Sequence, residues 1–387
     1  MNLMVLDKPY VSILMSQTLK HMDVQVIKCG DTRIPLEKSL NVRLLEETGN
    51  LAGDTELTLL CNSEYGVASI YPLLKGTQIW ENAELFKNKV KFRELLKQHY
   101  PDFYFREVTY EELVQLPASS LSLPLVIKPA KGFRSVGVYL VEKEEDWPSI
   151  CRQIQSDMIA AKEIYPDSVV SASSFILEEW IKGDEYAVDA YYDENGEPVV
   201  LNVYKRMFAH ETDTSDRIYF TGKSVLKESL SKVEAFMRSM GQVISLRRFP
   251  MHFEIRVTDS GRLIPIEVNP LRFAGLCTTD LGAHAYGINV YEYFFEQKKP
   301  NWAEIIASLD DSYFSFLCAE LPLSIDGRSI ESVHDRRFVK NFSDILEYRL
   351  VSYEEYPTFS VVFYRSNSLE ENKHLLELDL EQYLVMK

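Results

Sequence analysis

Two glutamates and an asparagine on one segment of the chain carry side-chain oxygens of the kind that bind a hard divalent cation. Apolar strands flank the turn DSGR, and a two-residue or four-residue loop there places Glu254 opposite Glu267. The same register places His252 opposite Asn269, so four polar groups share one face. Directly opposed carboxylates repel each other, which a cation between them would relieve. Because Mg²⁺ prefers oxygen ligands and shares its remaining positions with waters and phosphates, the hairpin predicts a magnesium–nucleotide site.

A plainer interpretation of the same hairpin stays open. A glutamate pair beside Asn and His on a strand face is usually a solvated surface. A three-residue loop would also shift the register and scatter the four groups. The opposite face carries Phe253, Ile255, Ile266 and Val268, which indicates that the hairpin packs on a core.

A lysine and a loop upstream could neutralise phosphate charge. Lys128 ends the apolar strand LVIK, where a buried stem would present its ammonium at the mouth of a sheet. The loop that follows carries Lys131, Arg134 and Ser135, whose cations, backbone amides and hydroxyl could bind phosphate oxygens. The loop is poor in glycine, so an ordinary hairpin turn is the alternative.

The segment ILEEWI followed by KGDE has features of a nucleoside site. A strand edge offers backbone donors and acceptors to a purine, and Glu185, seven residues after Glu178, could accept both ribose hydroxyls. Taken alone, these acidic residues would be interpreted as surface charge.

The ordered set VIKPAKGFRSVGV, FILEEWIKGDEYAVD and HFEIRVTDSGRLIPIEVNP resembles the ATP-grasp superfamily, specifically its carboxylate–amine ligases. The resemblance covers about residues 85–300 well and the flanks loosely. It implies a fold of the α/β and α+β classes: an N-terminal preATP-grasp α/β domain at residues 1–83, an ATP-grasp N-lobe at 84–182, a C-lobe with the metal hairpin at 183–304 and a small C-terminal α+β cap at 305–387.

The resemblance also implies roles for individual residues. Its ATP-binding positions are Lys89, Lys128, Ser135, Glu178, Glu179, Ile181, Glu185 and His252. Its metal ligands are Glu254, Glu267 and Asn269, and Asn269 is also implied in catalysis. Arg272 is similar to the arginine that clamps the transferred phosphoryl group and the tetrahedral intermediate, although Leu271 separates it from the Asn-Pro pair. Lys205 and Arg206 are either γ-phosphate or substrate contacts, or solvated charges at a strand end.

The activity that the resemblance implies is an ATP- and Mg²⁺-dependent ligase, with Mn²⁺ as a substitute ion. Such an enzyme activates a small carboxylate, an amino acid among the candidates, as an acyl phosphate, joins it to an amine, and releases ADP and phosphate. Two alternatives stay open: a small-molecule kinase, and a nucleotide-binding module without turnover. Three retained metal-ligand positions argue against the module. The tract 206–222 is either a lid over the acyl phosphate or a surface loop.

The elements that must position these residues follow from the apolar pattern. Runs at residues 3–6, 24–27 and 57–61, with a helical pattern at 10–22, predict an opening βαβ unit. The loop CNSEYG follows the last of these strands, at the carboxyl end where open α/β sheets usually bind ligands. It has no glycine fingerprint, so a dinucleotide site is not expected.

Further along the chain, the same patterns predict one helix over residues 83–99 and a hairpin that carries Lys128. They also predict strands and helices at the following positions: hairpin strands at 123–129 and 136–142, strands at 175–181, 185–193 and 198–204, a helix at 225–246, and strands with a final polar helix at 369–377 in the C-terminal part.

Charge and composition narrow the classes of partner. The chain has 42 basic and 58 acidic residues, a net charge of −16, with no local basic stripe, so we expect no nucleic-acid partner. Five scattered cysteines fit neither a disulfide framework nor a zinc site. The N-terminal segment lacks the apolar core of a signal peptide and no stretch is long enough to span a bilayer, so we expect a cytoplasmic protein without a membrane partner. A homodimer is compatible with this composition.

Overall fold

The computed structural model describes residues 1–387 except 50, 52, 54–55, 132–136, 165–173, 211–212, 214 and 323–324, and it leaves the side chains of residues 158–164 undescribed. The chain begins with a four-stranded parallel sheet in the order β3 (Asn41–Leu44), β2 (Gln25–Lys28), β1 (Asn2–Leu6) and β4 (Thr58–Cys61). Serine hydroxyls cap its helices, Ser12 on α1 (Ile13–His21) and Ser63 on α2 (Glu64–Ile70). The predicted βαβ start is confirmed. The edge strand β3, whose side chains are mostly exposed, has no apolar run in the sequence.

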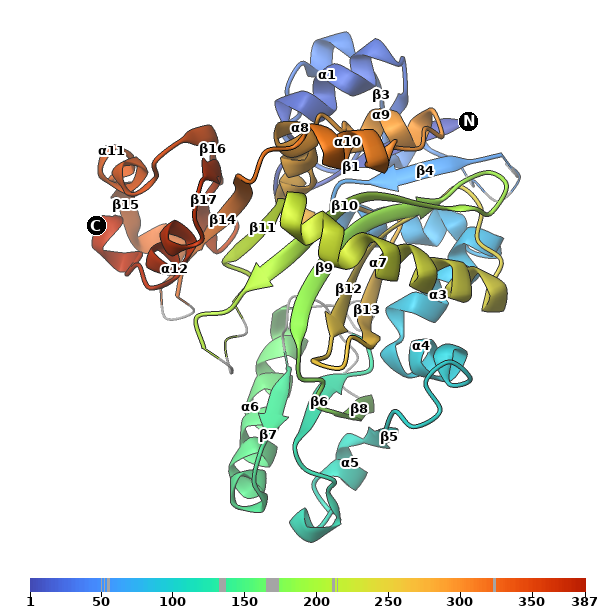
Figure 1. Cartoon of the computed structure of the whole chain (residues 1–387), viewed down its shortest axis with the longest axis vertical. Helices are drawn as coiled ribbons and strands as arrows, with labels where there is room; N and C mark the ends of the chain where they lie inside the picture. The colour runs from blue at the N-terminus through green and yellow to red at the C-terminus, as the bar shows by residue number, and fades with distance from the viewer. Residues whose placement is uncertain are drawn as a thin grey trace.

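A second, antiparallel sheet has the order β5 (Phe105–Thr109), β8 (Ser174–Glu179), β6 (Leu125–Pro129) and β7 (Tyr139–Val141). Apolar side chains of its strands form a separate core, to which Trp147 and Ile154 of α6 (Trp147–Ile164) contribute. Figure 1 shows this sheet and α6 at one end of the molecule and the N-terminal sheet at the other. The predicted hairpin around Lys128 is therefore confirmed as β6 and β7.

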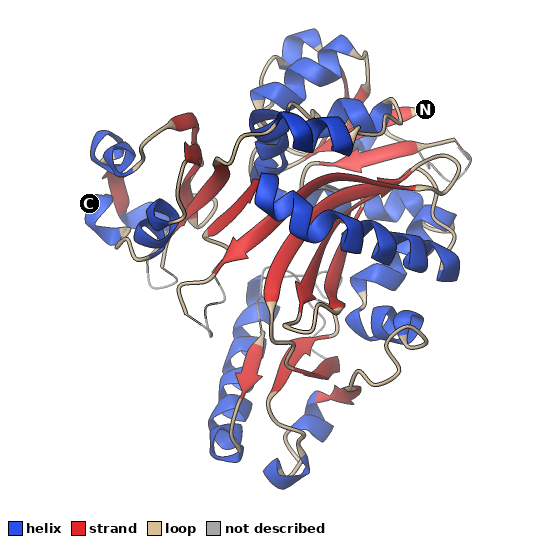
Figure 2. Cartoon of the chain, viewed as in Figure 1, coloured by secondary structure: helices blue, strands red, loops and turns tan. Residues whose placement is uncertain are grey.

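The largest sheet has eight antiparallel strands, and it carries the hairpin that the sequence singled out. Its order is β13 (Leu263–Pro270), β12 (Phe249–Val257), β9 (Asp184–Tyr192), β10 (Pro198–Met207), β11 (Ile218–Gly222), β14 (Tyr313–Glu320), β17 (Thr358–Ser366) and β16 (Ile345–Leu350). The long helix α7 (Lys223–Val243) lies across one face with its apolar side inward (Figure 2). The other face stays available for the site.

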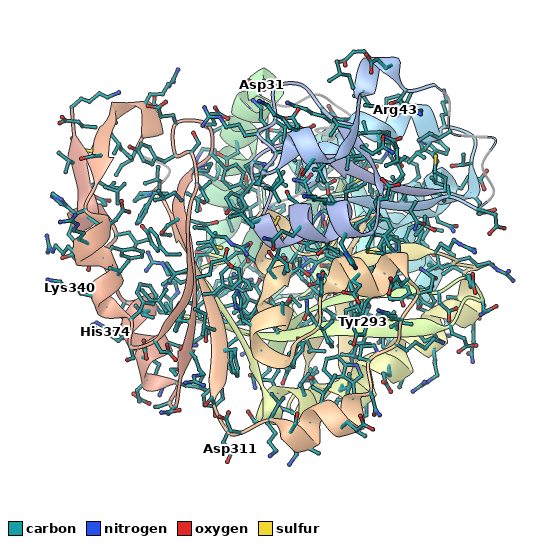
Figure 3. The ribbon with its side chains drawn as sticks, turned by 90° about the horizontal axis from the view of Figure 1, so that it is seen from above. Asp31, Arg43, Tyr293, Asp311, Lys340 and His374 are labelled. Carbon is teal, nitrogen blue, oxygen red and sulfur yellow. The ribbon has the colours of Figure 1, made fainter. Side chains whose placement is uncertain are left out.

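The eight-stranded sheet continues past the predicted boundary at residue 305, because β14 pairs with β11. The C-terminal part adds β15 (Ile330–Val333), β18 (Leu384–Met386), α11 (Asp335–Phe338) and α12 (Glu370–Leu376). Figure 3 shows this part, marked by Lys340 and His374, on the opposite side of the molecule from Arg43 in the N-terminal sheet. The expected α/β and α+β fold is confirmed, and the division into four domains stays a prediction.

The prediction of a single helix over residues 83–99 is wrong in one respect. The chain forms two helices here, α3 (Gln78–Lys87) and α4 (Lys89–Leu96), which Asn88 separates in an extended conformation. The Asn88 side chain accepts hydrogen bonds from the amides of Val90 and Lys91, both at 3.0 Å, and so starts the second helix. Lys89 therefore occupies the first position of α4.

Four short helices complete the helical elements outside the 3₁₀ turns in the described part of the chain: α5 (Tyr110–Leu113), α8 (Leu281–Tyr286), α9 (Val290–Phe295) and α10 (Trp302–Ser308). Among the described residues, no helix combines the length and the apolar character needed to cross a membrane.

Candidate active site

The hairpin of β12 and β13 has the predicted register at the four polar residues. Glu254 lies opposite Glu267, and His252 lies opposite Asn269. The Asn269 amide donates to Glu267 Oε1 at 3.4 Å. The register shifts immediately afterwards, so that Ile255 faces Pro265 instead of Ile266. This β-bulge leaves the site intact and turns Ile266 toward a small apolar cluster beside the hairpin.

The two opposed carboxylates have unequal surroundings. Burial alone would raise the pKa of Glu267, but the ammonium of Lys89, 3.0 Å from Oε2, lowers it below its ordinary value together with Lys128 and Asn269. Burial and the Glu267 carboxylate raise the pKa of Glu254 well above its ordinary value. A negative charge on Glu254 is thus poorly compensated by the protein.

This donor set fits a magnesium ion. Two carboxylates and one amide supply only oxygen ligands on one strand face, and a cation would remove the electrostatic cost of ionising Glu254. No group of three or more His, Cys, Asp or Glu side chains with metal-binding geometry is found among the described residues. The predicted ligands do not contradict this finding, because they comprise only two such side chains, Glu254 and Glu267, and the third ligand is Asn269.

Lys128 on β6 is held by a buried carboxylate on the neighbouring strand β8. Glu178, 2% exposed, accepts from the Lys128 ammonium with one oxygen and from Arg93 Nε at 2.8 Å with the other. Burial would raise the pKa of Glu178, but the two cations lower it to about 2. Both oxygens of the carboxylate are therefore engaged with cations of the protein. Arg93, which also stacks on Phe103 at 4.3 Å, did not stand out in the sequence.

The predicted hinge lies beside an apolar cluster. Ile181 packs with Phe103 and Ile264, and its carbonyl accepts from Arg256 Nη1 at 2.6 Å. The Glu179 amide donates to the Tyr104 carbonyl at 3.1 Å, while burial raises the pKa of its carboxyl group. Contact of Glu178, Glu179 and Ile181 with adenine stays a prediction.

Glu185, the predicted ribose ligand, is 3% exposed and lies between two guanidinium groups. Arg206 Nη1 donates to one oxygen at 2.7 Å, and Arg256 Nε donates to the other at 2.9 Å. The structure thus pairs two predicted site residues, Glu185 and Arg206, with each other. Sequence reasoning missed Arg256, although strand periodicity places it on the same face as His252 and Glu254.

His252 is oriented by Asp189, which has no exposed surface. The Asp189 carboxylate accepts from His252 Nδ1 and the Ala274 amide, both at 2.8 Å, and from three further donors, Asn202, Tyr204 and Thr279. Burial would raise the pKa of Asp189, but these hydrogen bonds and His252 lower it. An ionised carboxylate only accepts hydrogen bonds, so we assign the proton of neutral His252 to Nδ1, which leaves Nε2 as an acceptor.

One predicted residue, Lys205, lies away from the site. Lys205 points to the face of the sheet opposite Arg206, where its ammonium is 2.7 Å from Asp184 and 3.6 Å from Glu228 on α7. Because neighbouring residues of a strand face opposite sides of the sheet, Arg206 lies on the same face as the site and Lys205 lies on the other face. Ser135 lies outside the described residues.

The extra residue before Arg272 docks the hairpin on the N-terminal sheet. Leu271 has a positive φ of 64°, and its carbonyl accepts from the Cys61 amide at 2.8 Å. Arg272 Nε lies 3.1 Å from Glu64 Oε2, and Lys87 Nζ lies 2.8 Å from Oε1 of the same carboxylate. Burial opposes ionisation of Glu64, but the two cations lower its pKa. The loop CNSEYG thus reaches the predicted catalytic arginine.

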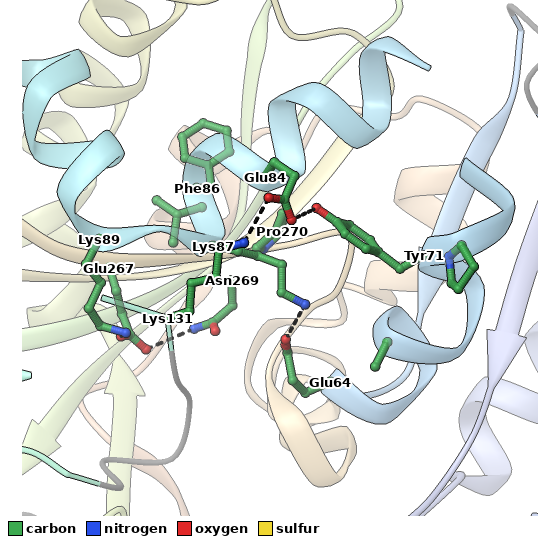
Figure 4. Close-up of a pocket in the computed structure, with 13 residues that line it drawn as sticks. Glu64, Tyr71, Glu84, Phe86, Lys87, Lys89, Lys131, Glu267, Asn269 and Pro270 are labelled. Atoms are coloured by element: carbon green, nitrogen blue, oxygen red, sulfur yellow. Dashed lines mark hydrogen bonds and ion pairs between the residues drawn. The ribbon is translucent and has the colours of Figure 1, made fainter. Parts of the chain in front are cut away.

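Two pockets meet at Glu64 and Asn269. Pocket A, shown in Figure 4, is lined by Glu64, Ala68, Tyr71, Pro72, Glu84, Phe86, Lys87, Lys89, Lys131, Glu267, Val268, Asn269 and Pro270. Its lysines face glutamates: Lys131 lies 2.9 Å from Glu84, whose other oxygen accepts from the Tyr71 hydroxyl.

Pocket B lies on the other side of this junction. The N-terminal domain contributes Pro9, Ser63, Glu64 and Tyr65. The hairpin and the turn after it contribute His252, Glu254, Asn269, Arg272, Ala274, Gly275, Leu276 and Thr278. The other strands and loops contribute Ala187, Tyr204, Arg206, Asp216, Tyr219, Phe316, Cys318, Glu320 and Tyr356. The predicted metal ligand Glu254 and the predicted catalytic residues Asn269 and Arg272 therefore border one cavity.

Comparisons with known proteins agree with this arrangement. The family model of the ATP-grasp domain matches residues 121–280. A comparison with curated proteins by sequence gives no match.

Three solved structures are similar over nearly the whole chain. They are an L-amino acid ligase from Bacillus licheniformis (17% identity, TM-score 0.66, covering 100% of this chain and 98% of that chain), an N5-carboxyaminoimidazole ribonucleotide synthetase from Thermotoga maritima (14%, 0.62, 99% and 98%) and a biotin carboxylase from Campylobacter jejuni in complex with β,γ-ATP (13%, 0.64, 100% and 92%). At these identities the similarity establishes the fold. The resemblance predicted from the motifs is confirmed at this level: residues 121–280 match the ATP-grasp domain, and the chain has the fold that these three enzymes share.

Proposed function

We propose that the protein is an ATP- and Mg²⁺-dependent ligase that activates a carboxylate as an acyl phosphate and joins it to an amine. The observation that carries the proposal is the meeting of the metal hairpin, Arg272 and pocket B at one point. The match to the ATP-grasp domain supports ATP and Mg²⁺ as cofactors. The fold shared with a ligase and a synthetase supports the reaction class.

The reaction requires positioning and charge neutralisation more than a side-chain nucleophile. Lys128, fixed by Glu178, and Lys89, at the start of α4, would neutralise phosphate charge. When bound, Mg²⁺ neutralises phosphate oxygens and polarises the γ-phosphoryl group. Glu254, Glu267 and Asn269 would hold that ion.

In the first step, a substrate carboxylate oxygen attacks the γ-phosphorus, the bond to the bridging oxygen breaks, and ADP leaves. In the second step, an amine nitrogen attacks the acyl carbon, the carbon–oxygen bond breaks, and inorganic phosphate leaves with its electron pair while the amine loses one proton. Arg272 presents planar donors to the charge that develops at the acyl phosphate and the tetrahedral species. Glu64 would keep that guanidinium at the border of pocket B.

The test uses hydroxylamine as a general amine. The purified chain is incubated with MgATP, hydroxylamine and a panel of carboxylic acids, and ADP, phosphate and hydroxamate are measured. A ligase forms the three products in equal amounts only when an acid is present. ADP with a phosphorylated acceptor and without free phosphate would establish the kinase alternative, and absence of ADP with every acid would leave only the binding module.

A further inference from the structure

Pocket B extends far beyond the reacting groups. Along its floor, Glu254 on β12 faces Ala187 on β9, and Ala187 faces Tyr204 on β10. The floor continues through Tyr219 on β11 to Phe316 on β14, which are also directly opposite. Each of five adjacent strands thus contributes at least one lining side chain. Four spacings of about 4.8 Å give a floor of roughly 19 Å, several times the rise of about 3.4 Å per extended residue.

The two ends of this floor differ in chemistry. The hairpin end is polar and carries His252 and Arg272. The far end is aromatic: the rings of Tyr219 and Phe316 stack with centroids 5.4 Å apart and planes at 22°, and Tyr204 meets the Phe316 ring edge-on at 5.9 Å. Aromatic walls of this kind favour ring or apolar ligand groups.

Two features between the ends favour an elongated ligand. Ala187 leaves room for a ligand beside Glu254, because its side chain is only a methyl group. Toward the far end, Asp216 and Glu320 also line the pocket, and Asp216 accepts from the Tyr219 hydroxyl at 2.9 Å. These two carboxylates outnumber the one guanidinium that lines this end, Arg206, whose Nη1 lies 3.7 Å from Asp216, so the negative excess disfavours a second anionic group on the ligand.

We propose that pocket B binds a carboxylic acid that carries an aromatic or extended apolar group and no second anionic group. The inference rests on the proposed ligase function and names its acid substrate class. The carboxylate lies at the hairpin end near Arg272, the chain passes over Ala187, and the apolar group contacts Tyr204, Tyr219 and Phe316. The C-terminal part of the chain, through Phe316, thereby determines specificity.

Matched acids test the proposal. Propanoate is compared with 6-phenylhexanoate and with 8-phenyloctanoate, which are long enough to carry the ring toward the far end, by hydroxamate formation and by titration calorimetry of the chain with MgADP. We expect each aryl acid to have a kcat/KM at least roughly tenfold above that of propanoate, with tighter binding. Dodecanedioate, which is long enough to carry its second carboxylate toward the far end, should bind no better than propanoate.

Two variants locate the effect. Phe316→Leu should reduce the aryl preference roughly tenfold through KM, with the KM for ATP unchanged, and Ala187→Val should lower turnover of aryl acids more than that of propanoate. Phe342→Leu is the matched control, because Phe342 packs in a separate core that does not line pocket B. Thermal melting of each variant separates loss of fold from loss of preference.

The outcomes separate the inference from the proposed function. Turnover of short acids with no gain from the aryl group, or an aryl preference unchanged in both Phe316→Leu and Ala187→Val, would overturn the inference and leave the ligase reaction standing. Absence of nucleotide turnover would overturn the ligase reaction. The calorimetric comparison then decides the inference alone, because equal binding of aryl and short acids contradicts it.

Discussion

Glu178, which is buried, and Glu254, which is half-buried at the edge of pocket B, are two carboxylates with opposite electrostatic surroundings. Glu178 lies between Lys128 and Arg93, and the two cations hold its pKa far below the ordinary value. Glu254 faces another carboxylate, Glu267, and its pKa is raised. A charge that the protein's own cations neutralise, as at Glu178, has a structural role. A charge that the protein leaves without a counter-charge, as at Glu254, indicates a ligand-binding position.

The largest effect in this comparison is expected from Glu178→Gln. The substitution leaves Lys128 and Arg93 buried with a neutral partner, which costs about 3–5 kcal/mol of unfolding free energy. Urea denaturation measures it. Glu370→Gln, in the exposed pair with Lys373, should cost about 0–1 kcal/mol. A loss for Glu178→Gln as small as that of the control would contradict the structural role of the buried pair.

The same residue predicts a dependence on pH. The folded-state pKa of Glu178, about 2, lies below its ordinary value of 4.5, so its contribution to stability is present above pH 4.5 and is lost as the pH falls toward 2. Denaturation of the wild type and Glu178→Gln at several pH values should therefore give curves that converge in acid. Parallel curves down to pH 2 would show that Glu178 does not account for this loss.

On the hairpin, Glu267→Gln should act on turnover rather than on the fold. It removes one ligand charge and the partner of Lys89, so we expect kcat to fall roughly 10²–10³-fold and Mg²⁺-dependent nucleotide binding to weaken. The control is Glu234→Gln, which breaks only a surface pair with Arg238 on α7. Turnover equal to that of the control would remove Glu267 from the metal site.

Glu254→Gln sharpens the comparison, because it should stabilise the apoprotein. Opposed like charges destabilise a hairpin, so the variant should gain about 0.2–1 kcal/mol without Mg²⁺. Since the raised pKa of Glu254 makes wild-type stability fall as the pH rises above 4.5, the gain should grow over that range. Calorimetric melting should show that Glu254→Gln melts above the wild type without ligand and below it with MgADP. If the variant without ligand melts below the wild type without ligand, the two carboxylates do not repel each other as inferred.

The hairpin could be predicted from sequence because its register depends on local information. Strand alternation and one turn place Glu254 opposite Glu267, and only the bulge that displaces Ile266 left no signal. The loop after β4 was also indicated, since a carboxyl strand end is a general ligand position.

The partners of the buried charges could not be predicted in this way. Arg93 and Glu178 are 85 residues apart, and Arg256 and Glu185 are 71 apart, so only the assembled sheets bring them together. Such pairs make Glu178 and Glu185 members of ion pairs, and their contact with a nucleotide stays a prediction. The break at Asn88 was detectable, because Asn is a favoured N-cap, but an apolar pattern running through it concealed the boundary.

The last expected effect concerns that break. Asn88→Ala removes the cap of α4 and should cost about 1 kcal/mol of stability, as should Asn301→Ala, which removes the cap of α10 away from both pockets. The two variants should differ in nucleotide binding, because Lys89 directly follows Asn88. The Lys89 ammonium contacts Glu267, and its backbone amide donates to the Ala130 carbonyl at 2.9 Å. We expect the KM for ATP to rise by up to about tenfold, or 1.4 kcal/mol, in Asn88→Ala alone. Equal KM values in the two variants would show that α4 positions Lys89 without help from its cap.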